Sequence, residues 1–147
     1  MTINIRVKGA SAERDIANKL NEIISKVLKE FGVTDTIKDN HTWFCQRNQN
    51  QSAVGGSDLT NTYGYCIEVK RQETLNINSW WKQVTLAATK NGEIPVLIYR
   101  QTRKQWKCVI QGYIALPNGQ FGACKAEVDF DTFLKAFESH VRHKLKG

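Results

Sequence analysis

The sequence predicts a mixed α/β or α+β domain with one central β-sheet flanked by helices. Segments with apolar residues at helical spacing alternate with short strand-like segments, in the order helix, strands, helix, strands, helix. The chain has 147 residues, of which 41% are hydrophobic, so it is long and apolar enough to form one core without help. No internal repeat, low-complexity tract or linker divides it, and we therefore expect residues 1–147 to form a single domain.

The first predicted element is a helix over residues 11–31, with Ser11 as its N-cap and Gly32 as its stop. Its apolar residues share one stripe, when placed at about 100° per residue: Ile16, Ala17, Leu20, Ile24, Val27 and Phe31. Glu13 lies close to the centre of this stripe, whereas Asp15 points toward solvent. A carboxylate on a core-facing stripe destabilises the fold unless something binds it. The alternative is that Glu13 belongs to the first turn, where the helix dipole favours an acid.

Strand-like segments follow this helix. Residues 41–47 predict a short strand, and the polar, glycine-rich residues 48–57 predict a loop. A hairpin-like segment then covers residues 55–73, with a turn near Tyr63. In residues 65–70 apolar and polar side chains alternate, which is typical of a β-strand.

The remaining residues predict a second helix, two further strands and a closing helix. The second helix covers residues 76–91 and stops at Asn91-Gly92. Trp80 and Trp81 are adjacent, so they cannot share one helix face. One of them is expected in the core, and the other is exposed, at a dimer interface or against DNA.

Residues 95–101 and 105–116 predict apolar strands, joined by a turn around residues 102–104. Residues 129–145 predict an amphipathic helix. Its inward residues are Phe130, Phe133, Leu134, Phe137 and Val141. The residues after about 116 serve dimerisation, DNA binding or only the core, and the sequence leaves this choice open.

The hairpin-like segment carries charges in a pattern that suits a metal ion. Side chains alternate between the faces of a strand, so Glu68 and Lys70 point the same way, roughly 6–7 Å apart. A turn near Tyr63 would place Asp58 opposite Glu68, with Cβ atoms roughly 5 Å apart. Two facing carboxylates repel unless a cation lies between them, and Mg²⁺ accepts one or two carboxylates and keeps waters or phosphate oxygens. Lys70 would then orient or help deprotonate a metal-bound water, or balance charge on a phosphate. The alternative is a solvated strand face with an ordinary Glu and Lys.

The formal net charge of +7 favours a polyanionic partner, most often nucleic acid. The basic residues are spread along the chain, so any binding surface has to be assembled by the fold. Arg47, before the hairpin-like segment, and Arg71 and Lys82, after it, are candidates for phosphate contacts; the alternative for each is a solvated charge. Further basic residues surround the turn between the two later strands: Arg100, Arg103, Lys104 and Lys107.

Asp58 followed by the tripeptide Glu68-Val69-Lys70 resembles the PD-(D/E)xK nuclease signature. Residues 8–20, KGASAERDIANKL, are similar to the first helix of the archaeal-type Holliday junction resolvases, in which a glycine and small residues precede a Glu-Arg pair. Here these positions are Gly9 and Glu13-Arg14. The resemblance covers about residues 8 to 100.

This resemblance implies a restriction-endonuclease-like core and a magnesium-dependent phosphodiesterase, in which Mn²⁺ can substitute. Asp58 and Glu68 would hold the metal, with the backbone carbonyl of Val69 as a further ligand. Lys70 would act on the attacking water or on the scissile phosphate, and Glu13 would join the site through a water or a second ion. Resolvases of this type are homodimers that nick two opposed strands of a four-way DNA junction.

The sequence departs from the pattern in places. The residue before Asp58 is Ser57 instead of proline. Archaeal-type resolvases carry a functional serine in the loop before this Asp, and Ser52 or Ser57 would match it. In many relatives a polar residue of the second helix faces the site, a place that Gln83 would take; the alternative is a surface glutamine. Two other functions stay open, namely a restriction- or repair-type nuclease on duplexes, flaps or ends, and a non-catalytic basic DNA-binding module.

The four cysteines lie at no zinc-ligand spacing, which favours reduced thiols in a reducing compartment. The N-terminal residues lack the apolar core of a signal peptide, and no apolar run approaches the roughly 18 residues of a membrane span. We therefore expect a non-secreted protein in the cytoplasm of a prokaryotic or phage-infected cell, with no membrane partner.

Overall fold

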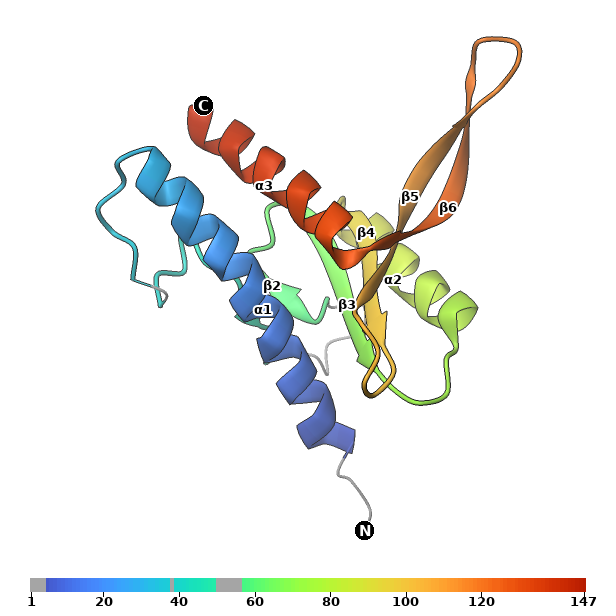
Figure 1. Ribbon diagram of the computed structural model, residues 1–147, viewed down its shortest axis with the longest axis horizontal. Helices are drawn as coiled ribbons and strands as arrows, with labels where there is room; N and C mark the ends of the chain where they lie inside the picture. The colour runs from blue at the N-terminus through green and yellow to red at the C-terminus, as the bar shows by residue number, and fades with distance from the viewer. Residues whose placement is uncertain (1–4, 38, 50–56) are drawn as a thin grey trace.

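The structure, a computed structural model, describes residues 5–37, 39–49 and 57–147 (Figure 1). The described elements follow one another as α1 (Ile5–Glu30), β1 (Gln46–Arg47), β2 (Leu59–Thr60), β3 (Tyr65–Arg71), α2 (Ile77–Asn91), β4 (Ile94–Arg100), β5 (Lys107–Ala115), β6 (Phe121–Asp129) and α3 (Phe130–Lys146). This sequence of elements confirms the predicted order of helices and strands and the α/β class.

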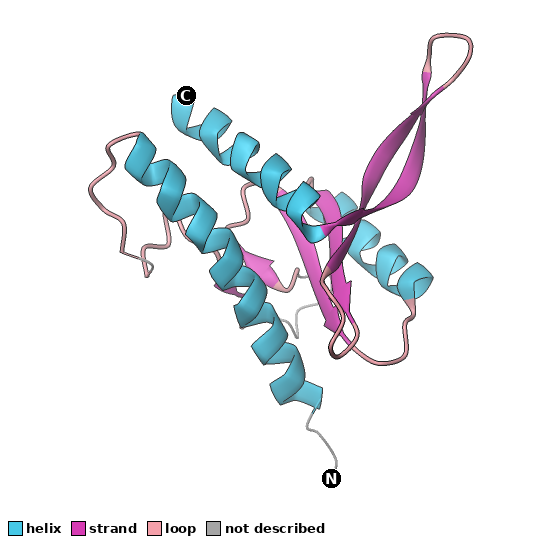
Figure 2. Cartoon of the chain, viewed as in Figure 1, coloured by secondary structure: helices cyan, strands magenta, loops and turns pink. Residues whose placement is uncertain are grey.

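A four-stranded mixed sheet with the order β3-β4-β5-β6 forms the centre. The β3–β4 pair is parallel, and the β4–β5 and β5–β6 pairs are antiparallel. Two adjacent parallel strands need a crossover connection, and α2 supplies it. The helices cover both faces of the sheet, α1 and α3 on one side and α2 on the other (Figure 2).

The side chains of β3 and β4 alternate between two cores. Ile67 and Val69 pack with α1 and α3, whereas Cys66 packs with the buried face of α2. β4 is buried on both faces, which explains why its sequence is apolar without alternation. This parity also places Glu68 and Lys70 of β3 on the α2 side of the sheet.

The first helix is longer than the sequence predicted. It begins at Ile5, so Ser11 lies inside the helix, exposed in the second turn, and is not its N-cap. The helix ends as predicted, because Gly32 adopts a left-handed conformation (φ 69°) and donates its N–H to the carbonyl of Lys29. Phe31, predicted on the buried stripe, lies just beyond the helix and is 39% exposed.

In residues 57–73, the described part of the predicted hairpin, no ladder forms between its two arms. β2 pairs antiparallel with β1, in a separate two-stranded sheet, and not with β3. The predicted strand over residues 41–47 is reduced to Gln46–Arg47, while Phe44 and Cys45 are buried before it. Cys45 is held from outside the sheet, because the Asn21 side chain bonds both its N–H and its carbonyl.

No strand was predicted over β6, which pairs with β5 along the full length of both strands. Its residues are mostly small or polar, with little β-propensity to reveal them. Asp129 ends the strand and caps α3 by accepting the N–H of Thr132. The inward residues of α3 are as predicted: Phe130, Phe133, Phe137 and Val141 are buried, and Leu134 packs partly buried against the core.

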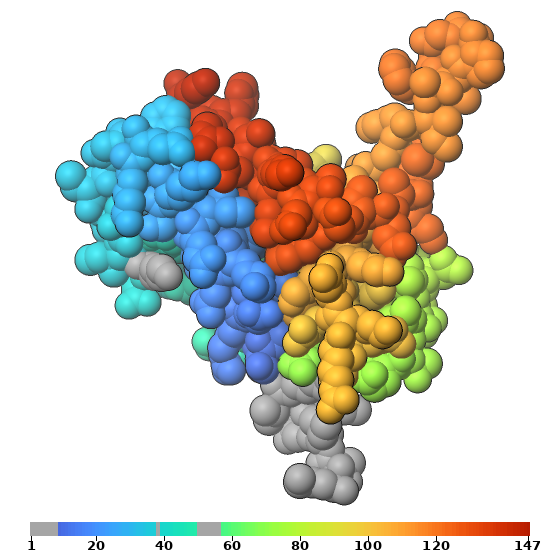
Figure 3. Space-filling view, viewed as in Figure 1, coloured from blue at the N-terminus to red at the C-terminus, as the bar shows by residue number. Residues whose placement is uncertain are grey.

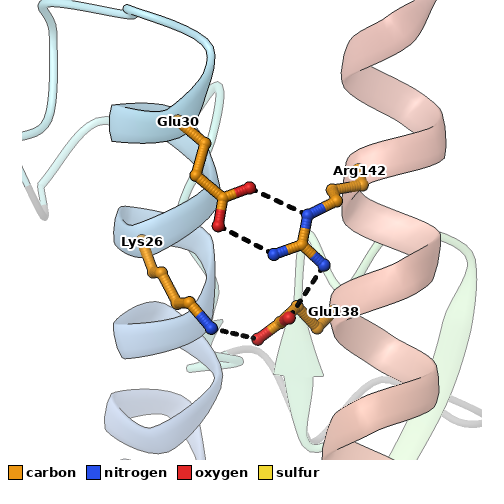
Figure 4. A network of polar contacts seen from close by, with 4 residues as sticks. All are labelled: Lys26, Glu30, Glu138 and Arg142. Atoms are coloured by element: carbon orange, nitrogen blue, oxygen red, sulfur yellow. Dashed lines mark hydrogen bonds and ion pairs between the residues drawn. The ribbon is translucent and has the colours of Figure 1, made fainter.

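Charged side chains join α1 and α3 where the two helices lie side by side (Figure 4). Arg142 donates from Nε and one terminal nitrogen to the two oxygens of Glu30, each at 2.8 Å. Its other terminal nitrogen bonds Glu138, which also receives Lys26 at 3.2 Å. Bidentate geometry makes this network more specific than a single surface ion pair. Among the described residues, no helix is long and apolar enough to cross a membrane.

Candidate active site

Glu13 is buried in the third turn of α1, with 5% of its surface exposed. Because the helix begins at Ile5, Glu13 is too far from the N-terminus for the helix dipole to explain it. Its carboxylate faces the Arg47 guanidinium of β1, at 3.6 Å from Oε1 to Nε. The buried acid on the apolar stripe is therefore bound by a cation, as its burial requires.

Asp58, the residue before β2, is fastened to the edge of β3 by two hydrogen bonds. Its N–H donates to the carbonyl of Ile67 at 2.9 Å, and its Oδ2 accepts the N–H of Val69 at 2.7 Å. Asp58 therefore lies beside Glu68 even though no β2–β3 ladder forms. The N–H and C=O of one strand residue point to the same side, so the carbonyl of Val69 faces the Asp58 edge as well.

Glu68 and Lys70 project from the same face of β3 and contact each other. The Lys70 ammonium lies 3.2 Å from Oε1 of Glu68. Glu68 is 7% exposed, and Lys70 is partly buried. A solvated strand face is therefore the wrong interpretation for Glu68, because burial of a carboxylate beside a lysine is typical of a functional or structural ion pair.

The electrostatics of the site oppose ionisation of its acids. Burial, and then the negative charge of Glu68, raises the pKa of Asp58 to about 8, although the Val69 N–H works against this. Burial also raises the pKa of Glu68, against the effect of Lys70. Glu13 adds to the repulsion at both acids. A bound cation would reverse this balance and favour both carboxylates in their ionised form.

The donor set suits a magnesium ion held by few protein ligands. Within the described ranges, no group of three or more His, Cys, Asp or Glu residues is arranged to hold a metal. Two carboxylates, from Asp58 and Glu68, and the carbonyl of Val69 share one edge. Mg²⁺ is commonly bound through one or two carboxylates and keeps several waters, so these three groups fit it. Glu13 faces Arg47 instead of completing a three-acid cluster.

The other residues that the sequence singled out lie around this centre or away from it. Ser57 donates its hydroxyl to the carbonyl of Leu59 at 2.6 Å, which shapes the approach to Asp58. Ser52 lies outside the described residues. Lys82 and Gln83 are exposed on α2, whose buried face is formed by Trp80, Val84, Ala87 and Ala88. Of the adjacent tryptophans, Trp80 is in the core, as predicted for one of them. Trp81, predicted to be exposed, is instead partly buried and packs against the same cluster.

Two arginines lie side by side at the ends of β3 and β4. Arg71 and Arg100 are Cα partners, and the parity of their strands places both on the α1 face. Among the residues that the structure describes, neither forms an ion pair, and the Nε of each is buried without a hydrogen-bond partner. Like charges directly across strands are destabilising, so this pair suits an anion. Arg100 also stacks on the Trp106 ring, at 4.9 Å to the centroid.

The sequence did not reveal the contact that positions the Trp106 ring beside Arg100. Asp15 was expected to point toward solvent, but it accepts the indole N–H of Trp106 at 3.1 Å. The two residues are 91 positions apart, so no local pattern could have revealed the contact. The bond fixes Trp106 under Arg100 and links α1 to the residue before β5.

The chain is similar to known proteins in both sequence and structure. Residues 4–143 match the profile of a family described as "Phage putative PDDEXK endonuclease". The chain is also similar to a solved structure, that of Hjc, a Holliday junction resolvase from the archaeal hyperthermophile Archaeoglobus fulgidus, at 15% identity and a TM-score of 0.43, over 81% of this chain and 85% of the other. No curated protein matches the chain. Since the family match runs over nearly the whole chain, the protein belongs to this family of phage PDDEXK endonucleases.

Proposed function

We propose that the protein is a magnesium-dependent DNA endonuclease that nicks paired strands of four-way junctions, and that Asp58, Glu68 and Lys70 carry the reaction. The observation that carries this proposal is the hydrogen bond from the Val69 N–H to Oδ2 of Asp58. It fixes the Asp58 carboxylate at the edge of β3, beside the ion pair of Glu68 and Lys70. Two acids and a lysine are thereby brought together beside β3.

Each residue has a role that its surroundings support. Asp58, Glu68 and the carbonyl of Val69 would hold Mg²⁺, or Mn²⁺ in its place, which supplies positive charge beside the scissile phosphate. Lys70, held by Glu68, would orient the attacking water and balance the charge that gathers on the phosphate. Water attacks phosphorus in line and the bond to the 3′ oxygen breaks, which leaves a 5′-phosphate and a 3′-hydroxyl. Glu13, which faces Arg47, would act on this centre through a water or a second ion.

The basic residues around the site suit the DNA backbone. Arg71 and Arg100 lie one position beyond Lys70 and its β4 neighbour, with buried nitrogens that lack partners in the described chain. Phosphate oxygens would supply those partners. Arg47 contributes less directly, since it already faces Glu13. Lys82 and Gln83 lie exposed on α2 and Ser57 lies beside Asp58, so these remain candidates for further DNA contacts, together with Ser52.

The residue pattern of the first helix supports the four-way junction as the substrate. Gly9 and the Glu13-Arg14 pair follow the pattern of the archaeal-type resolvases, and the burial of Glu13 against Arg47 supports this choice. A junction offers two symmetry-related strands, so we propose a homodimer with one site for each strand. The match to a phage family supports the further proposal that the protein acts in the cytoplasm of an infected host cell.

The first experiment is cleavage of a labelled four-way junction and of a matched duplex, with Mg²⁺ and with EDTA. Wild type is compared with Glu68→Gln, which keeps the size of the side chain and removes its charge. Symmetric, Mg²⁺-dependent nicking of the junction alone, absent in the variant, supports the proposal in full. Cleavage of both substrates keeps the nuclease and removes the junction preference. Intact junction binding without cleavage of either substrate would point to a DNA-binding module instead.

A further inference from the structure

The strands β5 and β6 extend beyond the sheet as a two-stranded arm. β4 pairs with β5 only as far as Ile110, whereas the β5–β6 pairing continues to Ala115 and Phe121. We call residues 111–125 the arm. Figures 1 and 3 show it projecting away from the body of the molecule, with its tip farthest from the helices.

The arm exposes large apolar side chains at its far end. Tyr113 is 71% exposed, Phe121 70%, Ile114 58% and Leu116 39%. A two-stranded hairpin is at best marginally stable alone in water, and an uncovered apolar ribbon invites pairing with another chain. A clustered apolar surface of this kind is typical of a site that contacts a partner.

The arm has a single charged residue, Lys125 at its base, in contrast to the rest of the chain. Residues 108–124 contain no Asp, Glu, Lys, Arg or His, although 24% of all residues are charged. A surface that contacts the DNA backbone needs Lys or Arg, and this segment has neither. Depletion of charge together with exposed aromatic residues is the composition of a protein–protein interface core.

We propose that the arm is the contact through which two copies of this chain form a dimer. Its apolar tip would be covered by the second copy, around a two-fold axis that makes one surface serve both partners. With roughly 200 Å² for a large, fully exposed side chain, the four exposed residues of the arm offer on the order of 500 Å² of surface. Two copies then reach about 1,000 Å² from these side chains alone, which is enough for a specific interface.

A dimer is what the proposed paired nicking requires, so this inference rests in part on the proposed function. The assignment of the arm to the dimer contact is argued from its composition and exposure, and it does not require cleavage. The two proposals can therefore fail separately. Molecular mass is measured on the metal-free full chain, in which no reaction occurs. The Glu68→Gln variant is expected to retain the mass of wild type, because Glu68 lies in the body of the domain.

The test is sedimentation equilibrium of the full chain from 1 to 100 μM, free of nucleic acid and at moderate salt. The chain has a mass of 16.8 kDa, and a dimer has twice that mass. The arm variant is Tyr113→Ser with Phe121→Ser, and the matched control is Ile37→Ser with Leu86→Ser. Ile37 and Leu86 are 67% and 66% exposed but lie outside the arm. Circular dichroism shows whether each variant keeps the wild-type fold.

We expect dimeric wild type and control, and at least a 100-fold weaker dissociation constant for the arm variant, because buried aromatic residues dominate interface energetics. Hydrogen exchange of wild type should also slow in residues 111–125 between 1 and 100 μM, which needs no variant. A wild type that remains monomeric at 100 μM overturns the proposal, as does an arm variant that dimerises like wild type. Unchanged mass combined with weakened DNA binding in the arm variant would assign the arm to nucleic acid and equally overturn it.

Discussion

Replacing Asp58 by Asn tests the electrostatic reasoning about the site without measuring catalysis. The substitution removes the charge but keeps a side-chain oxygen that can accept the Val69 N–H. In the metal-free protein the ionised Asp58 is opposed by burial and by Glu68. We therefore expect Asp58→Asn to be more stable than wild type near pH 8, in the presence of EDTA.

The size and sign of the effect follow from the pKa of Asp58, which rises from its ordinary 3.8 to about 8 in the folded protein. The folded state then binds more protons than the unfolded state across this window, so stability is full below the lower pKa and is lost as pH rises through the higher one. An isolated group with this displacement would lose roughly 6 kcal/mol. Asp58 is partly exposed and shares its site with Glu68, so we expect about 1–3 kcal/mol of the unfolding free energy to be lost.

The assay is urea unfolding at pH 5, 6, 7 and 8 in EDTA, for wild type, Asp58→Asn and the exposed control Asp39→Asn. Wild type and the control should lose stability with rising pH relative to Asp58→Asn. Wild type and Asp58→Asn differ at residue 58 alone, so the difference between their curves isolates Asp58. Millimolar Mg²⁺ should restore wild type and leave Asp58→Asn unchanged. Parallel curves for wild type and Asp58→Asn between pH 5 and 8 would refute the reasoning.

Three further predictions concern the neighbouring charges. Lys70→Met should lower the cleavage rate by about 10²–10³-fold while DNA affinity changes little, as single-turnover cleavage and fluorescence anisotropy would show; an equal loss in both would assign Lys70 to binding alone. Arg71→Met with Arg100→Met should weaken DNA binding and reduce the slope of log K against log salt by about 2, whereas the exposed control Lys135→Met leaves the slope unchanged. Arg142→Gln should lower the thermal midpoint, and the loss should shrink in 1 M NaCl, because the ion pairs to Glu30 and Glu138 are screened there. A salt-independent loss would show that packing of the Arg142 stem matters more than its charge.

The fold was predictable where burial leaves a periodic pattern. α2 and α3 each bury a regular face against the sheet, and β4 is a short apolar run buried on both faces. The predicted bounds of all three lie within about two residues of the observed ones. β6 was not predictable, because its partner is β5 and its own side chains are small or polar. The absence of a β2–β3 ladder was not predictable either, because it depends on a side-chain contact. Asp58 bonds β3 through its side chain as well as its backbone, so the segment runs beside the strand without continuing the ladder.

In the candidate site, too, some features could be predicted from the sequence and others could not. Glu13 could be identified because a charged residue interrupts an apolar stripe, and Glu68 and Lys70 because strand residues two apart share a face. Partners from distant parts of the chain could not be identified. Arg47 reaches Glu13 across 34 positions and Trp106 reaches Asp15 across 91, so both contacts exist only after the sheet and α1 have packed.

The charges at the end of β3 form two sets, each unfavourable without a ligand. On one side, Asp58 and Glu68 are buried close enough to resist ionisation. On the other, Arg71 and Arg100 stand side by side with buried nitrogens that lack partners in the described chain. A divalent cation relieves the first set and a phosphate backbone relieves the second, and each ligand also attracts the other. Binding of metal and of DNA should therefore be coupled and mutually strengthening. The same arrangement explains why the domain retains groups that lower its own stability. Acids and arginines that were fully paired within the protein would bind metal and DNA less strongly.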